Sequence, residues 1–483
     1  HRLYDTARGV RKYLDSSSTA AEATNSGSGN SNGISAFNSN GFTIGNDGYI
    51  NDSSSEFVSW TWRKAPKFFD VVTYTGNGAF SQVINHSLGC EVGAIFIKRT
   101  DASANWLCAM RVGTNSYKAM YLNTNDAAVG GNFSPSANTE RFVVGGNWNG
   151  DNVSPINTNG ATYVAYVFAH NDGDGEFGPD ADQDIIKCGS YTGNGSTTGP
   201  TVDLGFEPQW LLIKRATATA NWFLVDNMRG LPVGANSNPL FPNSSNAEST
   251  SGAAIDVLPT GFQPKAASIF INNSGDTYIY MAIRRGPLAA PESATDVFKV
   301  DQGHASNVPN FESGFPVDFG LLRQTSADGF KASARLTEGK YLETSSTAAE
   351  SSNSNYSFDY QDGWVGSAFG TSYYSWMWAR ARGYFDVVAY TGTGSAMTVN
   401  HNLGAVPEMM WVKSRSTSDD WAVYHSALGN TDNLFLNGTN ATASRIYWNN
   451  TTPTATQFSL GDHSKVSNSG TTYIAYLFAT VAG

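Results

Sequence analysis

Residues 162–169 read TYVAYVFA, and residues 472–479 read TYIAYLFA. Nearly every position is aromatic or aliphatic, without the polar alternation of a half-buried strand, so each stretch predicts a β-strand buried on both faces. Weaker copies are TYIYMA at 277–282, SYYSWMW at 372–378 and EFVSWTW at 56–62. The chain therefore contains five copies of one closing strand, which predicts a repeated all-β module.

Other motifs recur in a constant order around the closing strand. An opening strand runs into a glycine turn as FDVVTYTGNG at 69–78 and FDVVAYTGTG at 385–394, with YTGNG at 191–195. A Leu-Gly or Gly-Phe turn then leads to an apolar strand that ends in Lys or Arg, at 94–99, 210–215, 319–323 and 409–413. A tryptophan follows that strand at Trp106, Trp222 and Trp421. These motifs predict strands joined by tight turns.

The order of the motifs divides the chain into one half-module and four complete modules, each complete module about 100 residues long and able to bury its own core. We number them module 1 (1–66), module 2 (67–183), module 3 (184–290), module 4 (291–382) and module 5 (383–483). Module 1 matches only the later half of the others, since SSTAAE at 17–22 repeats at 345–350. We therefore expect upstream residues or a neighbouring chain to supply its missing strands, and we expect the modules to form beads in series.

Composition and charge exclude several classes of partner. The 483 residues carry a formal net charge of −11, and only 15% of them are charged. Nucleic acid and anionic membranes need a basic surface, so neither is expected as a partner. No apolar run approaches the roughly 20 residues of a membrane span. Three cysteines form no disulfide framework, so packing and a homo-oligomeric state are expected to provide stability.

These motifs resemble the repeat modules of marine phage, cyanophage-like tail-fibre and virion structural proteins. The resemblance rests on the Tyr-Thr-Gly-Asn-Gly opening, the Leu-Gly turn, the Lys-Tyr-Leu and Ser-Thr-Ala-Ala-Glu segment, and the closing strand. It covers essentially the whole chain and implies a tandem array of jelly-roll or lectin-like β-sandwich modules in a virion appendage. It brings no catalytic residues. Module 4 departs from the pattern, because Asp301, Gln302 and Gly303 stand where Tyr-Thr-Gly is expected.

The linker at 171–184 is a candidate calcium site. Alternating carboxylates in a glycine-rich loop can wrap Ca²⁺ with oxygen ligands, although the spacing fails the EF-hand rule. The alternative is a solvated acidic linker that keeps two modules apart. The candidate ligands are Asp172, Asp174, Glu176, Asp180 and Asp182, with Asp184 in the same stretch.

Two tryptophans are candidate ligand-binding residues. Trp148 and Trp448 lie in Asn- and Gly-rich segments, where an exposed aromatic face can bind a sugar, and the alternative is that each ring packs against the end of its sandwich. The spelling Gly-x-Ser-x-Gly at 29–33 lacks the strand and helix of a nucleophile elbow. His86 and His401 occupy the same module position beside a turn, which favours a structural role.

We expect a non-catalytic protein at the virion surface or in the extracellular space. It would contact other virion or filament subunits, and a host surface glycan or protein, through repeated weak contacts. One alternative is a self-assembling filament or surface-layer protein whose chains complete one another. Another is a secreted carbohydrate-active enzyme, which the lack of a recurrent carboxylate pair disfavours.

Overall fold

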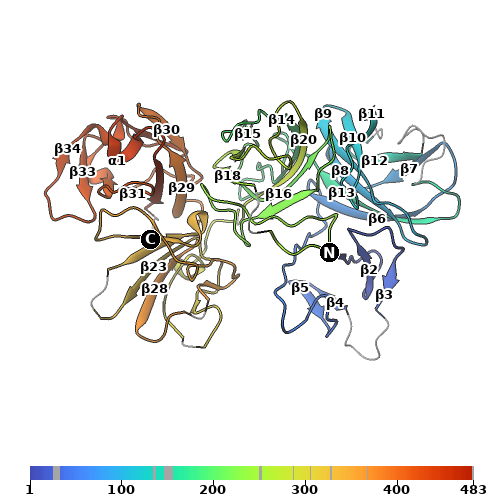
Figure 1. Ribbon diagram of the computed structural model, residues 1–483, viewed down its shortest axis with the longest axis horizontal. Coiled ribbons are helices and arrows are strands. Elements are labelled where there is room, and N and C mark those ends of the chain that lie inside the picture. The colour runs from blue at the N-terminus through green and yellow to red at the C-terminus, as the bar shows by residue number, and fades with distance from the viewer. Residues whose placement is uncertain are drawn as a thin grey trace.

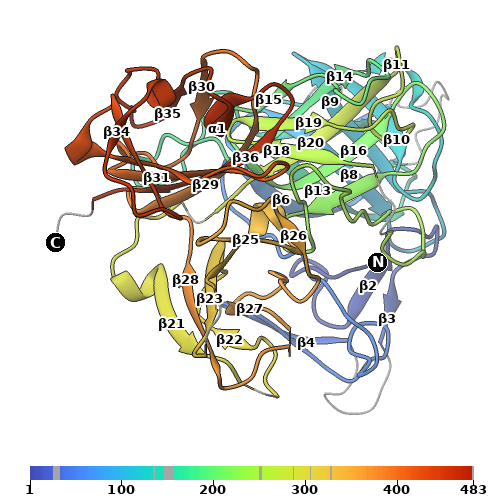
Figure 2. The same cartoon turned by 60° about the vertical axis from the view of Figure 1, so that its left-hand side comes forward.

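The computed structural model describes residues 1–25, 33–133, 137–145, 156–249, 253–286, 288–304, 306–326, 329–366 and 368–480. Antiparallel strands dominate it, which confirms the all-β sandwich array, and the described part holds one α-helix of four residues, α1 (Ser464–Ser467). Figure 1 shows module 3 between modules 2 and 5 along the long axis, with modules 1 and 4 below them. Figure 2 shows the same structure turned by 60° about the vertical axis, with modules 2 and 3 overlapping in the view.

Module 2 pairs a large sheet with a small one. The large sheet has the order β11-β10-β9-β8-β13-β6, and the small sheet pairs β12 with β7. The strands are β6 (Phe69–Thr75), β7 (Ser81–Asn85), β8 (Val92–Arg99), β9 (Leu107–Gly113), β10 (Ser116–Tyr121), β11 (Val129–Phe133), β12 (Arg141–Gly145) and β13 (Thr162–Ala169).

Module 3 repeats this plan, with sheet orders β14-β20-β16-β17 and β15-β19-β18. The strands are β14 (Ile186–Thr192), β15 (Val202–Asp203), β16 (Pro208–Arg215), β17 (Phe223–Asp226), β18 (Ile255–Leu258), β19 (Gly261–Pro264) and β20 (Thr277–Arg284).

Module 4 has sheet orders β21-β28-β23-β24-β25-β26 and β22-β27. Its elements are η1 (Ala294–Asp296), β21 (Phe298–Gln302), β22 (Phe311–Glu312), β23 (Phe319–Gln324), β24 (Lys331–Ala334), η2 (Arg335–Thr337), β25 (Lys340–Glu343), β26 (Ser351–Ser352), β27 (Gly363–Trp364) and β28 (Tyr373–Trp378).

Module 5 has sheet orders β29-β36-β31-β32-β33-β34 and β30-β35. Besides α1, its elements are β29 (Phe385–Thr391), β30 (Met397–Asn400), β31 (Met409–Ser414), β32 (Ala422–His425), η3 (Ser426–Leu428), β33 (Asp432–Phe435), β34 (Ala443–Ser444), η4 (Ile446–Trp448), β35 (Gln457–Leu460) and β36 (Thr472–Phe478).

Module 1 forms a three-stranded sheet β1-β2-β3 and a hairpin of β4 with β5. The strands are β1 (Arg2–Leu3), β2 (Lys12–Asp15), β3 (Ala23–Thr24), β4 (Ile34–Asn38) and β5 (Gly41–Ile44). The prediction of a closing strand at 56–62 is wrong, because this segment is irregular and no described strand pairs with it. A strand needs a ladder partner for its backbone groups, and this segment instead extends toward module 3, where the Trp60 Nε1 donates to Asp226 Oδ2 at 3.0 Å.

The closing strand is an interior strand of each large sheet, next to the opening strand at the edge. In modules 2 to 5 it pairs on one side with the opening strand and on the other with the apolar strand that follows the glycine turn: β13 between β6 and β8, β20 between β14 and β16, β28 between β21 and β23, β36 between β29 and β31. This interior position explains the continuous apolar sequence, because an interior strand with both faces covered has no solvent side.

The turn that follows the opening strand explains the glycine of the Tyr-Thr-Gly motif, because this position has no space for a side chain. A Cβ at Gly76 would lie 2.3 Å from the Thr158 carbonyl oxygen, and one at Gly392 would lie 2.4 Å from that of Asn468. The tyrosine two residues earlier stacks on a closing-strand tyrosine, with ring centroids 5.0 Å apart for Tyr74 and Tyr163. The motif therefore fixes the close approach of two loops beside a stacked ring pair.

Among the described residues two core clusters cross module boundaries, so the modules are not beads with wholly separate cores, whereas two other clusters lie within module 4 and module 5. One continuous cluster joins module 2 to Trp210, Leu212 and Met281 of module 3. A second joins the other face of module 3 to Phe319 of module 4 and Tyr476 of module 5. A sheet with two apolar faces needs cover on both, and neighbouring modules provide the second layer.

Candidate functional site: the joints between modules

Each of three joints between consecutive modules contains a buried lysine at the same position of its module. Lys98, Lys214 and Lys413 stand near the ends of β8, β16 and β31, and each is 0% exposed. Each ammonium donates to a backbone carbonyl of the preceding module: Lys98 to Thr19 at 2.9 Å, Lys214 to Asn125 at 3.3 Å and Lys413 to Thr347 at 3.2 Å. Each also donates to a carbonyl of its own module, so the buried charge is partly solvated by the backbone.

A tryptophan eight positions after each lysine completes the joint. Its indole Nε1 donates to a carbonyl of the preceding module: Trp106 to Asp15 at 2.9 Å, Trp222 to Tyr121 at 3.0 Å and Trp421 to Glu343 at 2.9 Å. All three rings are 0% exposed. The joint therefore combines a large apolar contact with directed hydrogen bonds, which fixes orientation as well as proximity. We call this arrangement the Lys–Trp clamp.

Backbone hydrogen bonds reinforce each clamp. The amides of Ala104, Ala220 and Asp419 donate to the same carbonyls of Thr19, Asn125 and Thr347 that accept from the lysines. Burial lowers the pKa of Lys98, Lys214 and Lys413 to about 8. The sequence motif that ends in Lys predicted a strand end, and the structure shows that its lysine is a joint residue.

Modules 3, 4 and 5 meet at Arg380, which is 2% exposed. Its guanidinium binds Glu207 of module 3 through two hydrogen bonds of 2.8 and 2.6 Å, and its Nε donates to Asp386 of module 5 at 2.6 Å. Its backbone amide donates to Asp318 of module 4 at 2.7 Å. One arginine after the closing strand of module 4 therefore neutralises carboxylates from two other modules.

A cavity of about 410 Å³ lies beside this junction and is lined by residues of modules 2, 3, 4 and 5. Arg284, Arg285 and Arg382 line it together with Asp182 and Asp184. Two of these arginines have acidic partners: Arg285 lies 3.5 Å from Glu207, and Arg382 lies 3.2 Å from Asp180. Arg284 donates to the backbone carbonyl of Asp184 at 3.2 Å. The mixed lining indicates a polar gap between packed modules.

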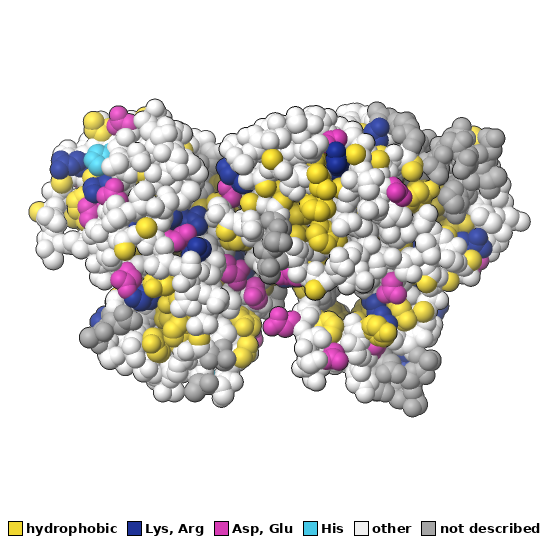
Figure 3. Space-filling model, in the orientation of Figure 1, with side chains coloured by type: hydrophobic (Ala, Val, Ile, Leu, Met, Phe, Trp, Pro, Cys, Tyr) yellow, Lys and Arg dark blue, Asp and Glu magenta, His cyan; other side chains and the backbone are white. Residues whose placement is uncertain are grey.

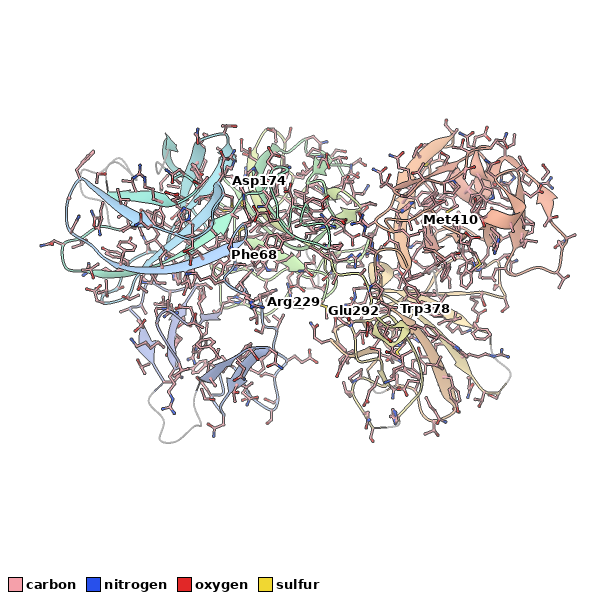
Figure 4. All side chains as sticks on the ribbon, turned by 180° about the vertical axis from the view of Figure 1, so that it is seen from behind. Phe68, Asp174, Arg229, Glu292, Trp378 and Met410 are labelled. Carbon is pink, nitrogen blue, oxygen red and sulfur yellow. The ribbon has the colours of Figure 1, made fainter. Side chains whose placement is uncertain are left out.

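The structure does not gather the acidic linker into a cation site. Among the described residues no group of three or more His, Cys, Asp or Glu side chains is arranged to hold a metal ion. Asp172 pairs with Lys187 at 3.0 Å, Asp174 and Glu176 lie 3.4 and 3.6 Å from Lys67, and Asp180 pairs with Arg382. Asp184 accepts the amides of Gly173 and Gly175. This arrangement does not support the calcium prediction for Asp172, Asp174, Glu176, Asp180 and Asp182, because Lys187, Lys67 and Arg382 pair with four of these carboxylates instead. Figure 4 labels Asp174 in this linker and Phe68, whose ring packs against Phe177.

The expectation that Trp448 is exposed is wrong. Its ring is 0% exposed in the core of module 5, and its Nε1 donates to the Asp432 carbonyl at 3.0 Å. The asparagines that suggested a ligand-binding loop, Asn449 and Asn450, have φ of 48° and 47°, a left-handed conformation that asparagine tolerates. Trp148 lies outside the described residues, as does most of the Gly-x-Ser-x-Gly segment at 29–33.

The histidines beside the turns have the structural role expected. The Nδ1 of His86 accepts the amide of Leu88, and the Nδ1 of His401 accepts the amide of Leu403, both at 3.2 Å. Burial lowers the pKa of both imidazoles, which favours the neutral form that can accept these bonds.

Glu338 gives a pH dependence that can be measured. Burial, together with the neighbouring Asp359 carboxylate, raises the pKa of Glu338 to about 8. A carboxyl group whose pKa is raised by folding takes up a proton on folding, so the free energy of unfolding should fall as the pH rises from about 4.5 to about 8. Glu338→Gln should flatten this slope in thermal unfolding curves, whereas Glu292→Gln, at an exposed carboxylate labelled in Figure 4, should leave it unchanged. An equal slope in Glu338→Gln and the parent chain would contradict this assignment.

No helix among the described residues is both long and apolar enough to cross a membrane. A search of curated proteins found no match to the chain. One family model, described as "Domain of unknown function (DUF7483)", matches residues 1–287 and 318–483. The stretch between the matched parts holds β21 and Gly303, where module 4 departs from the repeat. The chain therefore belongs to the DUF7483 family.

Proposed function

We propose that this protein is a non-catalytic structural and adhesion component of a virion appendage of the tail-fibre type, exposed on the particle surface. The observation that carries the proposal is the Lys–Trp clamp, which recurs at three joints with the same donors and the same carbonyl acceptors. Repeated, directed joints hold successive modules in a set geometry, as a projecting appendage requires. Only 15% of the residues are charged and the chain is rich in Asn, Ser and Thr, a composition that suits contacts with glycans or proteins.

Localisation tests this proposal. An antiserum against the chain should label the appendages of purified particles in negative-stain micrographs, and its peptides should co-sediment with those particles in a density gradient. Purified chain should also compete with the particles for adsorption to host cells. Presence of the chain in cells or culture medium, with none in purified particles, would overturn the proposal.

The segment at 56–62 favours a second candidate, a self-assembling extracellular filament. It matches the closing strand of the other modules, yet no described strand pairs with it, and Phe57 and Val58 are 51% and 36% exposed. Strands from a neighbouring copy would cover these side chains. In this case sedimentation velocity should show concentration-dependent growth, which Phe57→Asp should reduce. A concentration-independent monomer would exclude the filament.

A further inference from the structure

The large sheet of module 2 carries a row of five side chains that lie directly opposite one another across its strands, on the face that holds the clamp lysine. Module 1 covers the opening-strand end of this row, where Arg8 donates to the Tyr166 hydroxyl at 3.1 Å. Module 3 covers the rest, where Trp222 packs near Phe96. All five side chains are therefore at most 8% exposed: Val71, Tyr166, Phe96, Cys108 and Met120.

The corresponding row of module 4 is uncovered at its opening-strand end. Val300 is 43% exposed, and its cross-strand neighbours Trp376 and Leu321 are half-buried. Ala332 and Leu342, at the far end of the row, are 1% and 3% exposed because module 5 packs on them. The following module therefore covers its part of the row, whereas the preceding module leaves its part in contact with solvent.

Module 4 also lacks the Lys–Trp clamp. Arg323 stands at the register position of the clamp lysine, and Phe330 at that of the clamp tryptophan. Arg323 is exposed, and its guanidinium lies over the Phe330 ring, 4.7 Å from the centroid. Phe330 packs in turn on Trp376, with ring centroids 5.4 Å apart. We call Val300, Leu321, Arg323, Phe330 and Trp376 the open face of module 4, and Figure 3 shows hydrophobic side chains at the surface of this lower-left body.

Module 5 is uncovered at the opposite end of its row. Val387 and Tyr476, at the opening-strand end, are 0% and 1% exposed because module 4 packs on them. Leu434, at the far end, is half-buried, and Leu436 beyond it is 37% exposed. Where a following module is present, the residues at the position of Leu434 are at most 3% exposed: Leu14, Met120 and Leu342.

The carbonyl acceptors of a clamp are also present at this end of module 5. In all three clamps the carbonyl that accepts from the lysine lies four residues after the one that accepts from the tryptophan, as Thr347 follows Glu343. The strand register matches Phe435 to Glu343, and the same spacing then gives Thr439. Among the described residues no donor from another module reaches the carbonyls of Phe435 and Thr439. We call Leu434, Leu436 and these two carbonyls the open end of module 5.

We propose that a second copy of this chain docks the open face of its module 4 on the open end of module 5. Phe330 and Trp376 of one copy cover Leu434 and Leu436 of the other, and Arg323 donates to the Thr439 carbonyl, as the clamp lysines do within the chain. The occupant is a second copy because the two surfaces correspond to the two halves of an interface that the chain itself forms three times.

This contact joins two different surfaces, so each added copy leaves one of each kind free, and the assembly grows into a linear array or closes into a ring. The inference deepens the proposed function by naming the surfaces through which copies of the chain join in an appendage. It is tested on the purified chain, so its failure is distinguishable from a failure of the localisation experiment.

Sedimentation velocity over a range of concentrations tests the proposal. The parent chain should associate with a dissociation constant on the order of 100 µM, because the contact lacks the indole hydrogen bond of a clamp. Val300→Glu and Leu436→Glu should each weaken this association about tenfold or more, since each buries a carboxylate without a partner. An equimolar mixture of the two variants should form dimers that grow no further, because it retains one intact surface of each kind.

Val308→Glu in module 4 and Val406→Glu in module 5 are the matched controls, at valines that are 60% and 51% exposed outside the two surfaces. Both should associate as the parent does, and unfolding curves establish that every variant is folded. A parent chain that stays monomeric at several times the expected dissociation constant would overturn the proposal. So would a mixture of Val300→Glu and Leu436→Glu that stays monomeric, or association that Phe57→Asp abolishes and Val300→Glu leaves intact.

Discussion

Arg380→Met should lower the free energy of unfolding of modules 3 to 5 by about 3–5 kcal/mol, the usual cost of removing one partner from a buried ionic network. The substitution removes the only guanidinium that the described residues place on Asp386, and it leaves Glu207 with the longer 3.5 Å contact to Arg285. The two carboxylates are 1% and 5% exposed. Denaturant unfolding monitored by tryptophan fluorescence measures the loss. Limited proteolysis should show earlier cleavage between modules 3 and 4, because Arg380 holds three modules together.

Arg382→Met is the matched control, two residues along the same segment. Its ion pair with Asp180 has side chains 45% and 62% exposed, and exposed pairs contribute about 0–1 kcal/mol. Comparable losses in the two variants would show that burial of the Arg380 network has no special energetic role.

Trp222→Ala should destabilise the joint between modules 2 and 3 by about 3–5 kcal/mol, the typical cost of truncating a fully buried tryptophan. The change removes a ring that packs near Phe96 of module 2 and the hydrogen bond from its Nε1 to the Tyr121 carbonyl. Denaturant unfolding measures the loss. Trp222→Phe keeps most of the apolar contact but loses this hydrogen bond, and it should cost about 0.5–1.5 kcal/mol, the usual net contribution of one hydrogen bond.

Phe330→Ala is the control for the clamp. Phe330 has the register position of Trp222, but module 4 has no Lys–Trp clamp. It is half-buried, so its truncation should cost clearly less than that of Trp222. If the two truncations cost the same, the tryptophan would be acting within its own module and the clamp would not stabilise the joint.

Strand prediction from the sequence succeeded in the modules where the repeat also supplies the strands that pair with the predicted one. The closing strands β13, β20 and β36 match the apolar runs, because a run without polar alternation has few alternatives to an interior position in a covered sheet. The segment at 56–62 has the same pattern but no described partner strand, and pattern alone cannot supply one. Trp60 instead lies near Arg229 of module 3, which Figure 4 labels, with the guanidinium 5.5 Å from the ring.

The joints were harder to predict than the strands. A lysine at a strand end usually lies in solvent, so the pattern gave no sign that Lys98 and its counterparts are buried. The signal was present as a constant spacing, since each lysine precedes a tryptophan by eight residues in three modules. Trp448 shows the opposite error, since a residue expected to be exposed is buried. The neighbouring Asn449 and Asn450 suggested a loop, but they are there because asparagine tolerates the left-handed backbone conformation.

Small-angle X-ray scattering of the purified chain can show whether shared cores and Lys–Trp clamps hold the modules as one body. We expect a scattering profile that matches the curve calculated from this structure. A profile of separate domains on flexible linkers, with a larger radius of gyration, would contradict it.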